Sequence, residues 1–249
     1  MRRNAFWNGY GAFTHGSAGD VDMQLSIVIP VLNEAAGIEA MLLRLASLRR
    51  DGAQLIVVDG GSEDDTAMLA AAHADIVLSS ARGRALQMHA GALAANGDAL
   101  LFLHADTLLP DDAGVLISRA LRHHAWGRFD VALDGAHPVY RLIAAMMNVR
   151  SRMTSIATGD QAIFMRRDFY FAAGGFPPLA LMEDIAFCKR ARRLARPACL
   201  RERVLTSARR WEKHGVWRTI SLMWRLRLAY FLGADPDALA VRYGYRKKS

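Results

Sequence analysis

The sequence predicts an α/β fold with a mostly parallel central sheet and helices on both faces. Two observations carry this prediction. Short apolar runs rich in β-branched residues alternate with helix-like segments up to residue 110, and polar residues follow the end of each run. The 249 residues are 52% hydrophobic, so the chain can bury a substantial core.

Four strands and three helices are expected in this first half. The stretch "LSIVIPVL" (25–32) is a continuous apolar run, as in a strand buried on both faces. The strands expected after it cover 55–60, 76–80 and 98–106. The helices between the strands cover 33–50, 62–74 and 83–97, and Asn33 and Ser62 are the expected N-caps of the first two.

The second half is less regular. Its expected elements are a strand at 128–135, a helix at 138–153, a short strand at 161–167 and a helix at 181–195. The last helix begins with acids and ends with bases, as the helix dipole favours. No linker or repeat divides the chain, so we expect one domain over 25–215. Residues 1–24 are expected to be a disordered tail, and 216–249 an amphipathic helix with a basic tail.

The net charge of +8 (32 Lys and Arg against 24 Asp and Glu) suits phosphorylated ligands, anionic lipid or nucleic acid. No recognition-helix or RNA-binding signature supports nucleic acid as a partner. The two cysteines, Cys188 and Cys199, form no disulfide framework or zinc spacing, so a cytoplasmic location is expected. Arg225 and Arg227 interrupt the most membrane-like stretch, 220–234, which argues against a transmembrane helix.

Polar residues from distant segments should meet at one edge of the sheet, because ligands of such folds bind beyond the carboxyl ends of parallel strands. The residues expected at this edge are Asn33, Glu34, Asp59, Arg82, Arg84, His104 and Asp106. Their convergence predicts a ligand site.

Two of these strand ends suit a nucleotide. Asp59 precedes Gly60 and Gly61, where its carboxylate can accept hydrogen bonds from a base or ribose, or simply cap the turn. Arg82 and Arg84 lie at a helix start, where they can hold a diphosphate or remain solvated. The GxGxxG fingerprint of nicotinamide cofactors is absent.

The stretch "LLFLHADTLLP" (100–110) ends an apolar run with His104 and Asp106. One carboxylate there can hold a divalent cation if substrate phosphate and water complete the shell. On an extended segment both side chains point to the same side. The alternative is a helix N-cap with a histidine that lines the strand end.

Two later stretches carry further candidates. In "LMEDIAFCKR", Glu183 and Asp184 start a helix, where an acid can take a proton from an attacking hydroxyl or merely compensate the helix dipole. In "TSARRWEKHG", Arg210 and Trp211 can contact an acceptor or phosphate, or form a basic surface anchored by one core Trp.

Together these stretches resemble the family 2 glycosyltransferases, which have the GT-A fold. "SIVIPVLNE", "VVDGGSEDDT", "LFLHADT" and "MEDIAFCKR" occur in the family's order across residues 25 to about 215. More narrowly, "GRALQMHAGALAANGDALLFLHADT", "GDQAIFMRRD" and "LMEDIAFCKR" look like the bacterial arsenosugar-biosynthesis-type subgroup. That name is a genomic-context label and says little about the acceptor.

The resemblance implies an inverting, metal-assisted transfer from a nucleoside-diphosphate sugar, with Mn²⁺ or Mg²⁺. Asp184 aligns with the catalytic base, beside Glu183, and Asp106 with the metal ligand. The implied donor contacts are Pro30, Leu32, Asn33, Glu34, Asp59, Gly60, Arg82, Arg84, His104, Ala105 and Asp106. The implied acceptor or phosphate contacts are Gly159, Asp160, Gln161, Arg210 and Trp211.

The sequence departs from the family at two points. His104 replaces the first acid of the DXD motif, where it could bind ribose or join a Mn²⁺ shell. "ARRW" replaces the QxxRW of processive synthases, so we expect a non-processive enzyme. A sugar-nucleotide-binding regulator or scaffold without turnover is the alternative function.

The acceptor is expected to be a small molecule or a lipid-linked molecule. Residues 216–234 carry aromatic and Arg side chains among aliphatic ones, so this segment could lie on the inner membrane face as a peripheral contact. The alternative is a helix packed on the core or on a partner subunit.

Overall fold

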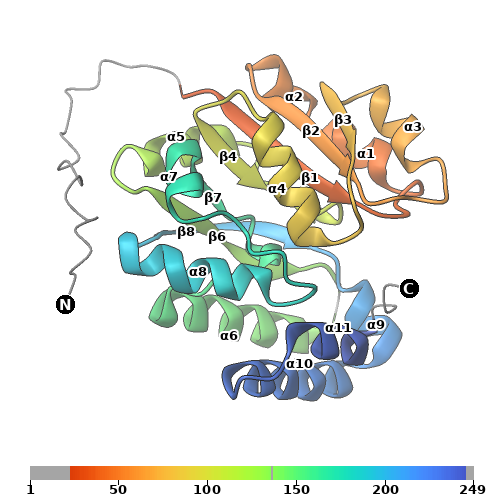
Figure 1. Cartoon of the computed structure of the whole chain (residues 1–249), viewed down its shortest axis with the longest axis vertical. Coiled ribbons are helices and arrows are strands. Elements are labelled where there is room, and N and C mark those ends of the chain that lie inside the picture. Colours follow the sequence, from red (N-terminus) through yellow and green to blue (C-terminus); the bar gives the residue numbers. More distant parts are fainter. Residues whose placement is uncertain (1–22, 136, 245–249) are drawn as a thin grey trace, which may run out of the picture.

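A single eight-stranded sheet runs through the protein, with helices on both faces (Figure 1). The computed structural model describes residues 23–135 and 137–244. The strands are β1 (Leu25–Val31), β2 (Gln54–Asp59), β3 (Ile76–Ser79), β4 (Ala99–Phe102), β5 (Thr107–Leu108), β6 (Trp126–Leu133), β7 (Phe164–Arg166) and β8 (Ala198–Thr206). Their order in the sheet is β3-β2-β1-β4-β7-β6-β8-β5.

The sheet changes character at β4. On one side, β3, β2, β1 and β4 are all parallel, and Val31 lies opposite Asp59 where β1 and β2 end. On the other side, β7 is antiparallel to both β4 and β6, β8 is parallel to β6, and β5 is antiparallel to β8. The predicted α/β class is confirmed, with a parallel first half and a mixed second half.

The helices cover both faces of this sheet. They are α1 (Ile38–Arg44), α2 (Ala46–Arg50), α3 (Thr66–Ala71), α4 (Arg84–Ala94), α5 (Ala113–Leu121), α6 (Pro138–Thr154), α7 (Arg167–Ala172), α8 (Glu183–Leu194), α9 (Arg209–His214), α10 (Val216–Phe231) and α11 (Pro236–Tyr243), with a 3₁₀ turn η1 (Gly159–Gln161). No helix in the described part of the chain has the length and apolarity needed to cross a bilayer.

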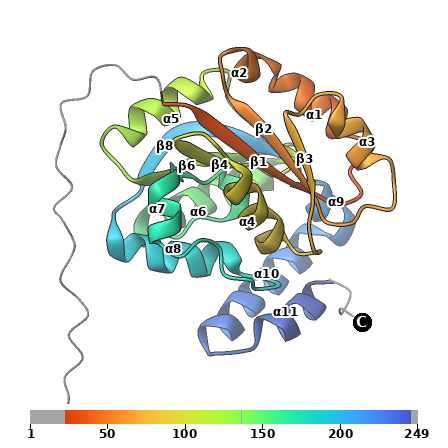
Figure 2. The same cartoon turned by 45° about the horizontal axis from the view of Figure 1, so that its top comes forward.

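Alternating strand residues feed two cores, one on each face. Ile27 and Ile29 of β1 pack with α1 and α5, whereas Val28 packs with α4, α7 and α8. The second core also receives Leu226 of α10 and Leu239 of α11. Both views place the α10–α11 pair below α8, away from the parallel strands (Figure 2).

The first helix begins later than predicted. Asn33 is not its N-cap; the helix starts at Ile38, and Asn33 has a left-handed φ of 55°. Its backbone N–H donates to Ser62 Oγ, and its side-chain Oδ1 accepts from the Glu63 N–H. Ser62 is likewise not the cap of α3, because its hydroxyl donates to Asp59. Both predicted cap residues are thus engaged in loop contacts, and neither caps a helix.

The predicted strand 98–106 is also shorter. β4 ends at Phe102, and a turn follows in which the Thr107 N–H donates to the His104 carbonyl at 3.1 Å. The turn lets β5 reverse and pair with β8. His104 and Asp106 therefore do not share one side of an extended segment, and the prediction that they point together is wrong.

Several elements were not predicted at all: α5, α7, α9, β5 and β8. β8 was not predicted because three consecutive charged residues interrupt its apolar pattern. These residues, Arg201, Glu202 and Arg203, are exposed, whereas Val204 is buried. The predicted tail 1–24 falls almost entirely outside the described residues.

Candidate active site

The carboxyl end of β2 forms a closed turn around Asp59. Its Oδ2 accepts from the N–H groups of Gly61 and Ser62, both at 3.0 Å, and its Oδ1 accepts from the Ser62 hydroxyl. The Gly60 N–H donates to the Val31 carbonyl at 3.0 Å. Asp59 thus caps its own turn, and this fixes the end of β2 beside that of β1.

Gln87 supports this turn by hydrogen bonds to the strand ends. This role was not predicted from the sequence. The buried amide of Gln87 donates to the carbonyls of Val31 (2.8 Å) and Val58 (2.9 Å), and a Cβ at Gly60 would meet it at 2.9 Å. The available signal was a lone polar residue on the apolar stripe of helix 83–97. Such a residue, once buried, must find partners.

The loop after β1 is tied to the loop after β2. The Glu34 N–H donates to Thr66 Oγ1 at 2.8 Å, and the Ala35 N–H donates to Asp64 Oδ2 at 3.1 Å. Backbone groups of 33–35 are therefore held in place before any ligand arrives, which suits recognition of a planar base.

Glu34 and Asp106 meet at one arginine. Arg209 Nη2 lies 3.6 Å from Glu34 Oε2 and 3.8 Å from Asp106 Oδ2. Burial raises the pKa of Glu34, Arg209 opposes this shift, and the charge of Asp106 adds to it. The carboxylates of Glu34 and Asp106 give this site a negative potential. The side chain of Arg209, which is 65% exposed, neutralises it.

His104 links the sheet edge to the start of α8. Its Nδ1 lies 3.3 Å from Asp160 Oδ1, and the flat backbone of Gly159 covers the rest of the ring. The Gly159 N–H in turn donates to Asp184 Oδ2 at 3.0 Å. Burial alone would raise the pKa of Asp160. The hydrogen bond and charge of His104, with the charges of Arg84 and Arg227, outweigh this effect, so the pKa is lowered.

The two adjacent acids of α8 occupy different environments. The Glu183 side chain is only 4% exposed, and its Oε1 lies 3.6 Å from Arg84 Nη1. Burial raises the pKa of Glu183 to about 6, Arg84 opposes the shift, and the neighbouring Asp184 adds to it. Asp184 is half-buried, and its Oδ2 and Oδ1 accept from the N–H groups of Gly159 (3.0 Å) and Ile185 (2.7 Å). Asp184 is thus the more exposed of the two acids.

The structure brings together most of the predicted site residues, with four exceptions. Arg82 is exposed beyond the end of β3. Trp211 packs against Tyr140, Ile143 and Ala208, as the core-anchor alternative predicted. The side chain of Arg210 lies outside the described structure. Gln161 is fully buried, where its amide donates to the Phe129 carbonyl, so it supports η1 and faces no ligand.

The donor set at Asp106 fits a hard cation only when a ligand completes the shell. No group of three or more His, Cys, Asp or Glu in the described residues could hold a metal ion by itself. Asp106 and Glu34 offer carboxylate oxygens, and Mg²⁺ and Mn²⁺ sites with substrate phosphates commonly use one or two of these. His104 is directed at Asp160 and Gly159 and offers no nitrogen to this pair.

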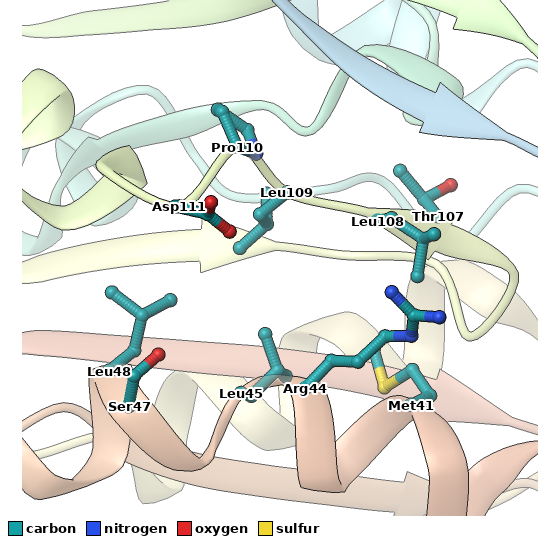
Figure 3. A pocket seen from close by; sticks show the side chains of 10 residues that line it. All are labelled: Met41, Arg44, Leu45, Ser47, Leu48, Thr107, Leu108, Leu109, Pro110 and Asp111. Atoms are coloured by element: carbon teal, nitrogen blue, oxygen red, sulfur yellow. The ribbon is translucent and has the colours of Figure 1, made fainter.

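A separate pocket of about 130 Å³ lies between α1–α2 and the segment 107–111 (Figure 3). Arg44 reaches from α1 toward Thr107 and Leu108, and Leu45 and Leu48 form the apolar wall. None of the predicted site residues lines this pocket, so it does not belong to the candidate site.

We expect Gly159→Ala to destabilise the protein by about 1–3 kcal/mol, since its Cβ would overlap the imidazole of His104 and force η1 or the ring to move. Urea unfolding measures the effect. Gly37→Ala is the matched control, because a Cβ there meets nothing within 4 Å. Equal stability of the two variants would contradict the close packing of Gly159 on His104.

Known structures share this architecture. S. aureus TarS 1–349 in complex with UDP-GlcNAc has a TM-score of 0.60 at 19% identity, over 74% of this chain and 58% of that one. Mannosyltransferase PcManGT from Pyrobaculum calidifontis, in complex with GDP-Man and Mn²⁺, has 0.60 at 20%, over 90% and 65%. Glucosyl-3-phosphoglycerate synthase from Mycobacterium tuberculosis, bound to Mn²⁺, UDP and its product, has 0.53 at 21%, over 74% and 71%. These likenesses confirm the predicted GT-A fold.

Sequence comparison gives the family. An uncharacterized glycosyltransferase of Mycobacterium tuberculosis is 37% identical over 100 residues, which are 40% of this chain and 42% of that protein. The chain thus matches less than half the length of this curated relative. The model of glycosyl transferase family 2 matches residues 26–176, more than half of the chain. The protein therefore belongs to glycosyl transferase family 2.

Proposed function

We propose that this protein transfers a sugar from a nucleoside-diphosphate sugar to an acceptor hydroxyl, with inversion and without processive elongation. The single observation that carries the proposal is the chain of contacts from His104, at the strand edge, through Gly159 to Asp184. This chain holds an accessible carboxylate next to the edge where the donor would lie.

The donor would lie across the ends of β1 and β2. The base would contact Pro30, Leu32, Asn33 and the Asp59–Gly60 turn, whose backbone is already fixed by Gln87. Arg84, at the start of α4, would face the diphosphate, and the exposed Arg82 could close over it. A guanidinium beside a helix N-terminus suits phosphate oxygens.

Asp184 would act as the general base. Its carboxylate takes the proton of the acceptor hydroxyl, the oxygen attacks the anomeric carbon, and the nucleoside diphosphate leaves with the bonding electron pair. One base suffices, since a single displacement inverts the anomeric centre. Glu183 is too buried to reach the acceptor, and its pairing with Arg84 gives it a supporting role.

Asp106, with Glu34 beside it, would hold Mn²⁺ or Mg²⁺ against the donor diphosphate. Such an ion, when bound, neutralises the charge that develops on the leaving group. Arg209 now contacts both carboxylates and would have to swing away, which its exposed position permits. The Mn²⁺-bound and nucleotide-bound neighbours support this assignment by analogy of fold alone.

The test is a thermal-shift panel of UDP-, GDP- and dTDP-sugars with Mn²⁺ and Mg²⁺, followed by assay of donor hydrolysis. We expect one nucleotide class to stabilise the protein in the presence of metal and to be hydrolysed slowly. Stabilisation without any turnover, even with added acceptors, would favour a sugar-nucleotide-binding regulator. No stabilisation by any donor would contradict the proposal.

We further propose that residues 25–215 form the transfer domain. Residues 216–234 would make a peripheral membrane contact that serves a lipid-linked acceptor. Large apolar side chains of α10 are exposed, with Trp217 at 76% and Trp224 at 64%. α6 adds an exposed stripe of Leu142, Met146, Val149 and Met153. Exposed aromatic and aliphatic side chains beside Arg suit an anionic bilayer surface.

We expect the double substitution Trp217→Ala and Trp224→Ala to weaken co-sedimentation with anionic vesicles by at least about tenfold, because burial of such side chains in the interface would be lost. Point substitutions are better than truncation, because Leu226 and Leu239 belong to the core. The control is Leu43→Ala with Met68→Ala, which are exposed on α1 and α3. Equal binding of both double variants would exclude the membrane contact.

The narrower likeness to the arsenosugar-biosynthesis-type subgroup rests on the stretches 83–107, 159–168 and 181–190. It stays a hypothesis about relatedness and does not identify the acceptor.

A further inference from the structure

Arg150 is a charged residue that the mechanism above leaves unused. It lies near the end of α6, and its Nε and Nη2 atoms are buried with no hydrogen-bond partner in the described structure. Arg128, Arg167 and Arg190 each leave only Nε without a partner, and Arg152, two residues on, contacts Asp130 at 2.5 Å. A buried N–H group without a partner is costly, so two on one guanidinium point to a missing ligand.

The surroundings of Arg150 indicate the charge of that ligand. Burial, together with the nearby positive charge of Arg227 on α10, lowers the pKa of Arg150 to about 10. The carboxylates of Asp184 and Asp160 oppose the shift by their charge, but neither makes an ion pair with Arg150 within 4 Å in the described residues. Arg150 and Arg227, from different helices, thus both lie close enough to Asp160 for their charges to act on it, and neither forms an ion pair with it in the described residues.

The position of the pair separates it from the donor edge. Arg150 belongs to α6, which packs on β6, and Arg227 belongs to α10, which packs with α9 and α11. The donor edge is built from the β1 and β2 loops and from the start of α4. Arg150 and Arg227 therefore come from helices that take no part in the donor edge.

We propose that Arg150 and Arg227 form an anion subsite for the acceptor, which would carry a phosphate or carboxylate group close to its attacking hydroxyl. The inference rests on the proposed transferase function and adds the acceptor class to it. Two guanidinium groups can hold an oxyanion through paired N–H···O contacts and leave the hydroxyl at Asp184. The anionic group could belong to a soluble molecule or to a lipid headgroup, and the chemistry of recognition is the same.

The experiment is calorimetric titration of the full-length chain with inorganic phosphate and with glycerol 3-phosphate. The donor site is first filled with the metal and the nucleoside diphosphate that the thermal-shift panel selects. Arg150→Gln and Arg227→Gln are compared with Arg141→Gln and Arg225→Gln, which are exposed arginines on the same two helices. We expect the first pair to weaken phosphate binding by at least about tenfold, and the control pair to leave it unchanged.

Three results would overturn the subsite: wild-type protein that binds no phosphate, equal binding by all variants, or equal loss in the control pair. Arg227→Gln keeps the test valid if Arg150→Gln fails to fold, because Arg227 is only half-buried. Nucleoside diphosphate affinity reports the proposed function separately. If it is absent while phosphate binding still depends on both arginines, the transferase proposal fails and the anion site stands.

A parallel arm distinguishes the two sources of the anion. The same variants are sedimented with phosphatidylcholine vesicles that contain or lack phosphatidic acid. Binding to phosphatidic acid that depends on Arg150 and Arg227 supports a lipid headgroup. Dependence seen only with glycerol 3-phosphate supports a soluble acceptor, and dependence in neither arm overturns the subsite.

Discussion

Asp184→Asn is expected to lower kcat by about 10²–10⁴-fold, the usual contribution of a general base. Asn is isosteric, and its oxygen can still accept the Gly159 N–H that now binds Asp184 Oδ2 at 3.0 Å, although it cannot also replace Oδ1, which accepts from the Ile185 N–H at 2.7 Å. It cannot accept the proton of the hydroxyl. Nucleotide affinity and the folded structure should therefore be unchanged, and a product assay at saturating donor measures the loss.

Glu183→Gln is the matched control for this prediction. Glu183 is the adjacent acid of α8, but its carboxylate is buried and directed at Arg84. We expect less than about a tenfold loss of kcat, since the amide preserves the shape of the side chain and no proton transfer is lost. Retained turnover in the Asp184 variant with loss in the Glu183 variant would reverse the assignment.

Asp106→Ala is expected to lower the Mn²⁺-dependent affinity for the nucleoside diphosphate by more than about tenfold. Loss of partners outside the first coordination shell already costs about 10–100-fold, so loss of a direct ligand should cost at least as much. Chelation of metal from the wild-type protein should reproduce the effect. The substitution should leave the fold intact, because the carboxylate is about one-third exposed and its nearest cation is 3.8 Å away.

Calorimetry with and without Mn²⁺ measures this prediction. Asp111→Ala is the control, since Asp111 is an exposed acid five positions further along the same segment. Unchanged Mn²⁺-dependent affinity in the Asp106 variant would exclude the metal role. A parallel loss with Glu34→Gln would show that both acids at Arg209 take part.

The parallel half of the fold was predictable because its signals are local. An apolar run such as 25–31 marks a strand buried on both faces wherever it lies, and α4 carries its period in its own residues. The family stretches added the order of the elements. β8 could not be found in this way, because Arg201 to Arg203 are exposed on a strand whose pairing with β6 depends on residues far away in the sequence.

Buried charged residues could not be predicted from the sequence either. Arg128 is 1% exposed and contacts Asp130, which also binds Arg152 at 2.5 Å. A sequence places arginines on the surface by default, since a buried charge is costly without a partner. Asp130, two residues along β6, supplies that partner, and α6 adds Arg152 to the pair but leaves two nitrogens of Arg150 without a hydrogen-bond partner in the described structure.

The sequence by itself determined the α/β class, the polar residues at the strand ends and the likeness to family 2, because burial, periodicity and motif order are written in consecutive residues. The tertiary structure alone decided what these residues contact. It engaged Asp59 in its own turn and Asn33 with the neighbouring loop after β2, aimed His104 at Asp160, and separated Asp184 from Glu183 by exposure. Such contacts join residues from distant segments, and only the folded chain fixes which side chains meet.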